Sequence, residues 1–211
     1  MSYLLSRRII GPRLLKRVTA MTGIEHIPKT GPALFVSNHV GCHDPLLLGA
    51  AIIMHTKGRK VHTLAKWRIL KFPLWRHWLG VIPTTPNPKA AFDLAGKHLD
   101  DGKFVLIYPE NGVNIQLSIG KVKTGAARLA LMKKVPLIPV SLKRTSPAPK
   151  SSLGYVAEIA YARLQIHIGA PIDLTGWYDQ PIDTPLLKAV NQAIMSRIAE
   201  TAGKHYAPPE A

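Results

Sequence analysis

The sequence predicts one α/β domain with a mixed, largely parallel central sheet flanked by helices, preceded by an N-terminal amphipathic helical segment. Beyond Gly31-Pro32, short apolar runs alternate with stretches of helical spacing, which is typical of strand–helix units. The chain has 211 residues, 46% hydrophobic and 19% charged, which is enough to bury a substantial core. No repeat or long linker divides residues 23–211, so we expect them to form one domain.

Residues 1–22 are expected to form the amphipathic segment. Apolar side chains recur there at helical spacing among several basic residues, no acidic residue precedes Glu25, and Pro12 would kink or break the helix. A basic amphipathic helix can lie in a lipid interface, held by its apolar face and by anionic headgroups. The alternative is a helix packed on the domain with a solvated basic face; we favour the membrane.

The elements of the domain then follow in order. Five apolar runs rich in β-branched and aromatic residues predict strands, at 33–36, 61–64, 104–108, 137–141 and 164–168. Four stretches with helical spacing predict helices, at 45–54, 89–99, 123–133 and 186–202. In parallel sheets the functional residues gather after the carboxyl ends of strands, so Asn38-His39 and Tyr108-Pro109-Glu110 are expected to share a site.

The net charge of +16 limits the class of partner. Such a field attracts polyanions, which are nucleic acids, anionic membrane surfaces or phosphorylated substrates. The basic residues are spread along the chain and do not interleave with aromatic ones, so we expect no nucleic-acid binding, although a basic lipid- or nucleic-acid-binding protein is the non-enzymatic alternative. A single cysteine, Cys42, and no run of about 18 apolar residues predict a protein of a reducing compartment without an ordinary transmembrane helix.

A general base is predicted just after the first strand of the domain. The chain there runs Ser37-Asn38-His39-Val40-Gly41-Cys42-His43-Asp44. A carboxylate on one nitrogen of an imidazole fixes its tautomer and leaves the other nitrogen to take a proton from a hydroxyl. His39 and Asp44 are therefore the candidate catalytic residues. The alternative is that Asp44 only caps the helix that begins at Pro45.

A metal site is a competing interpretation of the same segment. His39 and His43 are four residues apart, a spacing that binds zinc when both lie on one helix. Gly41 and the turn from strand to helix disfavour a regular helix there, and no second cluster of His or Cys stands in the other motifs. We therefore expect no metal at this site.

The sequence resembles the glycerolipid acyltransferase family, which includes the bacterial 1-acylglycerol-3-phosphate acyltransferases. Residues 38–44 match the Asn-His-x4-Asp motif of that family in full. Three further blocks follow in the order of the family, at residues 66–83, 108–110 and 135–140, and residues 122–130 also look familial. The resemblance covers residues 23–171, and the four blocks in order are far more specific than the first alone.

The resemblance implies transfer of a fatty acyl group from acyl-CoA or acyl carrier protein to the hydroxyl of a lipid precursor, with 1-acylglycerol 3-phosphate as the first candidate acceptor. His39 would be the general base and Asp44 would orient it, without a covalent intermediate and without a metal or organic cofactor. The implied place is the cytoplasmic face of the cell membrane, to which a peripheral enzyme of phospholipid biosynthesis would bind. An anionic membrane surface suits the basic chain.

The third block departs from the pattern of the family. After the glutamate the family has Gly-Thr-Arg-Ser, whereas this chain has Asn111-Gly112-Val113-Asn114 and so lacks the arginine that usually grips the acceptor phosphate. Other acceptors therefore stay open: a lysophospholipid with a larger headgroup, a glycolipid or an amino-lipid. The expected acceptor- and phosphate-binding residues are Lys66, Arg68, Glu110, Gly112, Lys121 and Lys123.

Overall fold

The computed structural model describes residues 6–66, 80–149, 158 and 160–206. The strands of its main sheet are β1 (Val18–Thr22), β2 (Ala33–Ser37), β3 (Val61–Ala65), β4 (Val81–Pro83), β5 (Phe104–Ile107), β7 (Leu137–Arg144) and β8 (Leu164–Ile168). Two further short strands are β6 (Ser118–Ile119) and β9 (His205–Tyr206). The α-helices are α2 (Gly11–Leu15), α3 (Asp44–His55), α5 (Pro88–Asp100), α6 (Gly125–Lys133) and α8 (Thr184–Ala202). The short helical turns are η1 (Ser6–Ile10), η2 (Ile24–His26) and η4 (Thr175–Trp177).

The main sheet has seven strands in the order β1-β8-β7-β2-β5-β3-β4. Neighbouring strands are parallel except β7 and β8, which are antiparallel. Strands β6 and β9 pair in parallel as a separate two-stranded sheet. The predicted fold class, an α/β domain with a mixed and largely parallel sheet, is confirmed.

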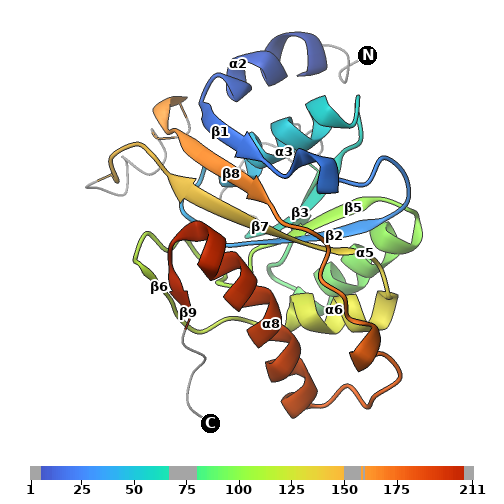
Figure 1. Cartoon of the computed structure of the whole chain (residues 1–211). Coiled ribbons are helices and arrows are strands. Elements are labelled where there is room, and N and C mark those ends of the chain that lie inside the picture. Colours follow the sequence, from blue (N-terminus) through green and yellow to red (C-terminus); the bar gives the residue numbers. More distant parts are fainter. Residues whose placement is uncertain (1–5, 67–79, 150–157, 159, 207–211) are drawn as a thin grey trace.

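Helices cover both faces of the sheet (Figure 1). On one face, α5, α6 and α8 pack against side chains such as Leu34 and Val36 of β2. On the other face, α3 packs against the alternate side chains of the same strand, among them Phe35. Because both faces are covered, all five residues of β2 are buried, as expected for a central strand of a parallel sheet.

The longer helices begin and end at residues suited to those positions. The Asn87 side chain accepts a hydrogen bond from the Ala90 backbone N–H at the start of α5, and Asp183 does the same for Leu186 at the start of α8. Gly203 ends α8 with φ of 66°, a left-handed conformation that glycine adopts at little cost. These signals agree with the helices predicted from the sequence.

The N-terminal segment differs from its prediction. Residues 6–15 are helical, but Val18–Thr22 is strand β1, which pairs with β8 at the edge of the main sheet. The helical prediction for residues 18–22 is therefore wrong. Val18 and Met21 have helical spacing, yet Val18, Thr19 and Thr22 are β-branched and favour a strand once a partner strand is available. Among the described residues, no helix has the length and apolar character needed to cross a membrane.

The topology brings three chain segments to one edge of the sheet. Strand β2 lies between β5 and β7 and is parallel to both, so all three strands end on the same side. The segments that follow β2 and β5 are the two in which the sequence predicted a shared site. Strand β7 runs beyond the end of β2, because Ser37 pairs with Val140 while β7 continues to Arg144.

Candidate active site

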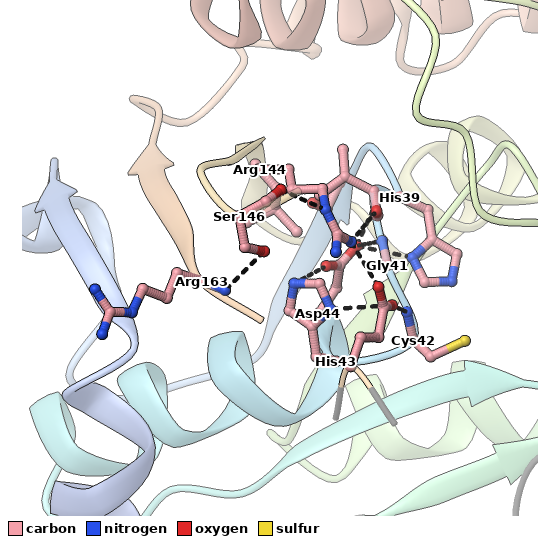
Figure 2. A network of polar contacts seen from close by, with 12 residues as sticks. His39, Gly41, Cys42, His43, Asp44, Arg144, Ser146 and Arg163 are labelled. Atoms are coloured by element: carbon pink, nitrogen blue, oxygen red, sulfur yellow. Dashed lines mark hydrogen bonds and ion pairs between the residues drawn. The ribbon is translucent and has the colours of Figure 1, made fainter. Parts of the chain in front are cut away.

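His39 and Asp44 lie in hydrogen-bond contact at this edge (Figure 2). His39 Nδ1 is 2.9 Å from Asp44 Oδ2, which also accepts hydrogen bonds from the backbone N–H groups of Val40 (2.6 Å) and Gly41 (3.0 Å). Asp44 is the first residue of α3, and His43 occupies the cap position. The carboxylate of Asp44 therefore points back toward the turn and His39, which is a different arrangement from a simple N-cap.

The contact fixes the role of each imidazole nitrogen. Because Asp44 Oδ2 is a hydrogen-bond acceptor, we assign the proton of neutral His39 to Nδ1, which leaves Nε2 with a free lone pair. The His39 side chain is 14% exposed, whereas that of Asp44 is fully buried. The pair thus presents a proton acceptor to a substrate and keeps its carboxylate away from water.

Tyr108 covers one face of His39. The two rings stack with centroids 4.4 Å apart at an interplanar angle of 26°. Burial, and to a lesser degree the charge of Asp44, hold the pKa of Tyr108 well above its usual value, so the phenol stays neutral. The ring of Tyr108 therefore restricts the rotation of His39, a contact that the sequence did not predict.

Asn38 joins the motif to the sheet. Its side-chain Nδ2 donates to the Leu142 carbonyl (2.9 Å) and its Oδ1 accepts from the Leu142 N–H (2.7 Å). Strand β2 has already ended here, so the carboxamide supplies the acceptor and donor that a further strand residue would have given to β7. Buried peptide groups need such partners, and Asn38 meets this need next to His39.

The third block contacts the backbone of His39 on both sides. Glu110 Oε1 accepts a hydrogen bond from the His39 N–H (2.9 Å), and Glu110 Oε2 accepts one from Asn114 Nδ2 (2.6 Å). The Asn114 N–H in turn donates to the His39 carbonyl (2.6 Å). Asn111 has φ of 57°, a conformation that asparagine tolerates better than most residues, and it makes the turn between them. Both oxygens of Glu110 are thus engaged inside the protein.

The other predicted acceptor residues that the structure describes lie around this edge. Gly112 is exposed within the third block, and Lys121 and Lys123 are exposed between β6 and α6. The Lys123 N–H donates to the carbonyl of Pro109 (2.9 Å), the residue that precedes Glu110. The backbone of Lys123 therefore lies close to the third block. Lys66 is exposed directly after β3, and Arg68 lies outside the described residues. Among the predicted acceptor residues that the structure describes, Glu110 is the one with a hydrogen bond to the His39 motif.

A further cation, Lys204, was missed by the sequence analysis. Its Nζ donates to the Asn114 carbonyl (2.8 Å), and the side chain is partly buried. Burial lowers the pKa of Lys204, while the charges of Glu110 and Asp44 act in the opposite direction, so this ammonium group lies within the field of both carboxylates. Pairing of β9 with β6 holds the end of α8 in this place.

A second carboxylate, Glu158, lies behind the motif. Its Oε1 accepts from the Cys42 N–H (2.8 Å) and contacts His43 Nδ1 (3.2 Å), and its Oε2 accepts from Arg144 Nη1 (2.6 Å). Burial first, and then the charges of Glu158 and Asp44, raise the pKa of the Cys42 thiol. The thiol is therefore protonated at neutral pH, which does not suit a nucleophile.

The chemistry that these side chains permit is proton transfer from a hydroxyl. The described residues contain no group of three or more His, Cys, Asp or Glu side chains that could hold a metal ion. His39 and His43 do not share a helix, because the residues between them form the turn before α3. Only the His39–Asp44 pair combines a partly exposed base with a buried carboxylate within this motif.

Comparisons with known proteins agree with this chemistry. A family model described as "Acyltransferase" matches residues 18–143. The 1-acyl-sn-glycerol-3-phosphate acyltransferase of Borreliella burgdorferi is 29% identical over 133 residues, which are 60% of this chain and 51% of that protein. The chain thus spans about half the length of this relative.

A solved structure shares the fold. The crystal structure of the 1-acyl-sn-glycerophosphate (LPA) acyltransferase from Thermotoga maritima matches with a TM-score of 0.63 and 18% sequence identity. The match covers 95% of this chain and 83% of that one. At this identity the likeness concerns the fold alone.

Proposed function

Because this chain belongs to the acyltransferase family, we propose that it transfers a fatty acyl group from a thioester to the hydroxyl of a lipid precursor. The observation that carries the proposal is the His39–Asp44 contact of 2.9 Å, with Asp44 buried and His39 partly exposed. Acyl transfer to a hydroxyl needs a base of this kind, since the alcohol itself is a weak nucleophile.

The proposed reaction proceeds in two proton transfers. His39 Nε2 takes the proton of the acceptor hydroxyl while the oxygen attacks the thioester carbonyl carbon. The negative charge of Asp44 stabilises the imidazolium that forms. The tetrahedral intermediate then collapses, the C–S bond breaks, and the proton on Nε2 passes to the leaving sulfur. No acyl-enzyme intermediate is needed, and the products are an ester and a free thiol.

Glu110 is assigned a positioning role in this proposal. Its two oxygens bind the His39 N–H and the Asn114 amide, so the carboxylate holds the backbone of the base. A carboxylate also repels a phosphate. We therefore assign Glu110 to the backbone of His39 and not to the acceptor phosphate.

The proposed acceptor is 1-acylglycerol 3-phosphate, and the proposed donor is acyl-CoA or acyl carrier protein. The name of the Borreliella burgdorferi relative supports this acceptor. Its phosphate would be bound by described cations near the carboxyl edge of the sheet, which are Lys66, Lys121, Lys123 and Lys204, with Gly112 allowing the backbone to come close. Arg68, which lies outside the described residues, stays a proposed phosphate-binding residue on its sequence position alone. Lys204 is the best placed of the described cations, because it binds the residue that follows Val113, where the family has arginine.

The proposed location is the cytoplasmic face of the cell membrane. In the helical residues 6–15, Ile9 is exposed beside the exposed basic residues Arg8 and Arg13. An apolar side chain flanked by cations suits the boundary between anionic headgroups and acyl chains. Residues 1–22 are accordingly proposed as the membrane-associating segment, although their last five residues belong to the sheet.

Thioester consumption tests the proposed function. Purified protein is given palmitoyl-CoA or palmitoyl carrier protein with lysophosphatidic acid, glycerol 3-phosphate, or lysophospholipids with larger headgroups. We expect turnover with lysophosphatidic acid, and we expect His39→Ala to abolish it. His26→Ala is the control that should retain turnover. His26 contacts the carbonyl of Ile168, which lies at the end of β8 away from the residue that pairs with Arg144. Turnover of a larger-headgroup acceptor alone would reassign the acceptor. Absence of turnover from folded, liposome-bound protein would contradict the proposal.

Lys204→Met tests the phosphate contact. We expect it to raise the KM for lysophosphatidic acid about 10-fold or more, the cost of a lost charged hydrogen bond, with little change in the KM for the thioester. Lys89→Met is the matched control, because Lys89 forms an exposed ion pair with Asp93 on α5. An unchanged KM in Lys204→Met would remove this lysine from the acceptor site.

A further inference from the structure

Asp44 has a second oxygen that the proposed mechanism does not use. While Oδ2 serves His39, Oδ1 faces His43 Nε2 at 3.5 Å (Figure 2). His43 and Asp44 are fully buried, and neither of these two atoms has a hydrogen-bond partner among the described residues. A buried carboxylate oxygen and a buried ring nitrogen thus face each other, and each requires a partner.

The other nitrogen of His43 also faces a carboxylate. His43 Nδ1 is 3.2 Å from Glu158 Oε1, and Glu158 is fully buried as well. Arg144 pairs with the second oxygen of Glu158 at 2.6 Å. The Arg144 guanidinium is in turn held by the carbonyls of Ser146 (2.9 Å) and Pro147 (2.7 Å). These side chains thus form a continuous row that begins at the partly exposed His39 and continues inward: His39, Asp44, His43, Glu158 and Arg144.

The two carboxylates beside His43 indicate how many protons its ring carries. A neutral imidazole has one N–H, so either tautomer would leave a lone pair of His43 facing a carboxylate oxygen. An imidazolium has two N–H groups and satisfies Asp44 on one side and Glu158 on the other. It also balances charge, because two buried carboxylates then face two cations, His43 and Arg144.

The packing around Gly41 also indicates a close contact between His43 and Glu158. A Cβ placed on Gly41 would lie 2.7 Å from Glu158 Oε1 and closer still to Cε1 and Nδ1 of the His43 ring. The backbone of the motif therefore packs directly against the contact between His43 and Glu158. Any larger residue at position 41 would force the two side chains apart.

We propose that His43 carries both ring protons and acts, with Glu158 and Arg144 behind it, as a positioning residue for Asp44. His43 holds Oδ1 so that Oδ2 stays aligned with His39, and it places a buried positive charge behind the carboxylate. The neighbouring titratable groups are those named in the row, the Cys42 thiol, the neutral Tyr108 phenol, Glu110 on the His39 backbone, and Lys204, whose charge interacts with Asp44 and Glu110. The catalytic consequence rests on the proposed function, whereas the protonation of His43 is independent of it.

Nitrogen-15 NMR of the imidazole rings in the full-length wild-type protein tests the protonation directly. The His43 signals are assigned by their loss in His43→Gln. At pH 8 we expect both ring nitrogens of His43 at imidazolium positions, with two N–H protons protected from exchange. In Glu158→Gln we expect one of these protons to be lost. A single protonated nitrogen at pH 8 in the wild type would overturn the proposal, whether or not the protein turns over any substrate.

The pH–rate profile tests the coupling to His39. His43→Gln removes a buried cation behind Asp44, so the surroundings of His39 become more negative and favour its protonated form. The acid limb of kcat/KM should then move to higher pH by about half a unit to one unit, which is the effect expected from the loss of one nearby buried charge. We expect kcat to fall about 10-fold with the acceptor KM unchanged. His26→Gln should keep the wild-type profile, and an unmoved acid limb in folded His43→Gln would contradict the proposal.

Discussion

Two histidines of this protein sit in opposite electrostatic surroundings. His39 stacks on Tyr108 and has the Asp44 carboxylate 2.9 Å from its Nδ1. His62, near the start of β3, stacks on His98 with ring centroids 3.9 Å apart. Burial, the charge of His98 and two neighbouring lysines lower the pKa of His62 to about 4. Both rings are partly buried and both are stacked.

One difference between the two histidines is the sign of the nearby charge. The carboxylate beside His39 stabilises a protonated ring, which is the state a general base reaches during the reaction. At His62, burial disfavours that state most, followed by the charge of His98 and by the neighbouring cations Lys60 and Lys103. Stacking and burial alone therefore do not suit a histidine to act as a general base. A buried carboxylate beside the ring, such as Asp44, is also needed.

Asp44→Asn should remove this difference and have the largest effect. The variant keeps the size of the side chain but takes the negative charge from His39, so the imidazolium loses its stabilising partner. We expect kcat to fall about 1,000-fold or more, as for other histidine–carboxylate pairs. Steady-state kinetics on protein with a wild-type circular dichroism spectrum provides the measurement. A loss of less than tenfold would mean that position, not charge, is what Asp44 supplies.

Glu110→Gln tests whether the backbone of His39 must be held as well as its ring. The variant side chain can still accept from the His39 N–H, but its NH2 group would face the NH2 group of Asn114. We expect about a tenfold lower kcat and a loss of about 1–2 kcal/mol in the free energy of unfolding. Kinetics and urea denaturation are the measurements. Glu25→Gln, at an exposed position in η2, is the matched control.

His62→Gln should have the smallest effect and only on stability. The unfolded chain protonates His62 near its ordinary pKa of 6.5, and the folded chain does so at about 4. In this window the unfolded state binds more protons, so stability is lost as the pH falls from about 6.5 towards about 4. Because His62 is only partly buried, we expect the variant to recover about 1 kcal/mol of that loss, with kcat unchanged.

Urea denaturation of wild type and His62→Gln at pH 7.5 and pH 4.5 provides the measurement for this last prediction. Equal losses of stability in the two proteins would show that the low pKa of His62 does not affect folding. A lower kcat in His62→Gln would instead show that the two histidines are coupled.

The parts of the fold predicted from the sequence are those with local signals. The five predicted strands and four predicted helices are present, because their apolar spacing and end residues act over a few positions. Strand β1 was mistaken for helix, because its pairing with β8 joins residues about 145 positions apart and no local pattern records that. Strands β4, β6 and β9 were not predicted, because each has only two or three residues and β9 pairs with β6 from a distant part of the chain.

The candidate site divides in the same way. His39 and Asp44 are close in sequence and were predicted as a pair. The groups that support them come from distant parts of the chain: Leu142 for Asn38, Glu158 for His43, and Lys204 for Asn114. Glu158 and Lys204 lie beyond residue 143, where the match to the family model ends. The motif identifies the reacting groups, whereas the partners that hold them become adjacent only in the folded chain.

The carboxamide of Asn38 bears on any attempt to move this motif into another protein. Its two hydrogen bonds require a neighbouring strand that is longer than the strand carrying the motif, with one free peptide pair at the matching height. A recipient sheet with strands of equal length would leave the amide unpaired and the loop without an anchor. The smallest transferable unit is therefore a pair of parallel strands of unequal length, β2 with β7, and not the seven residues of the motif alone.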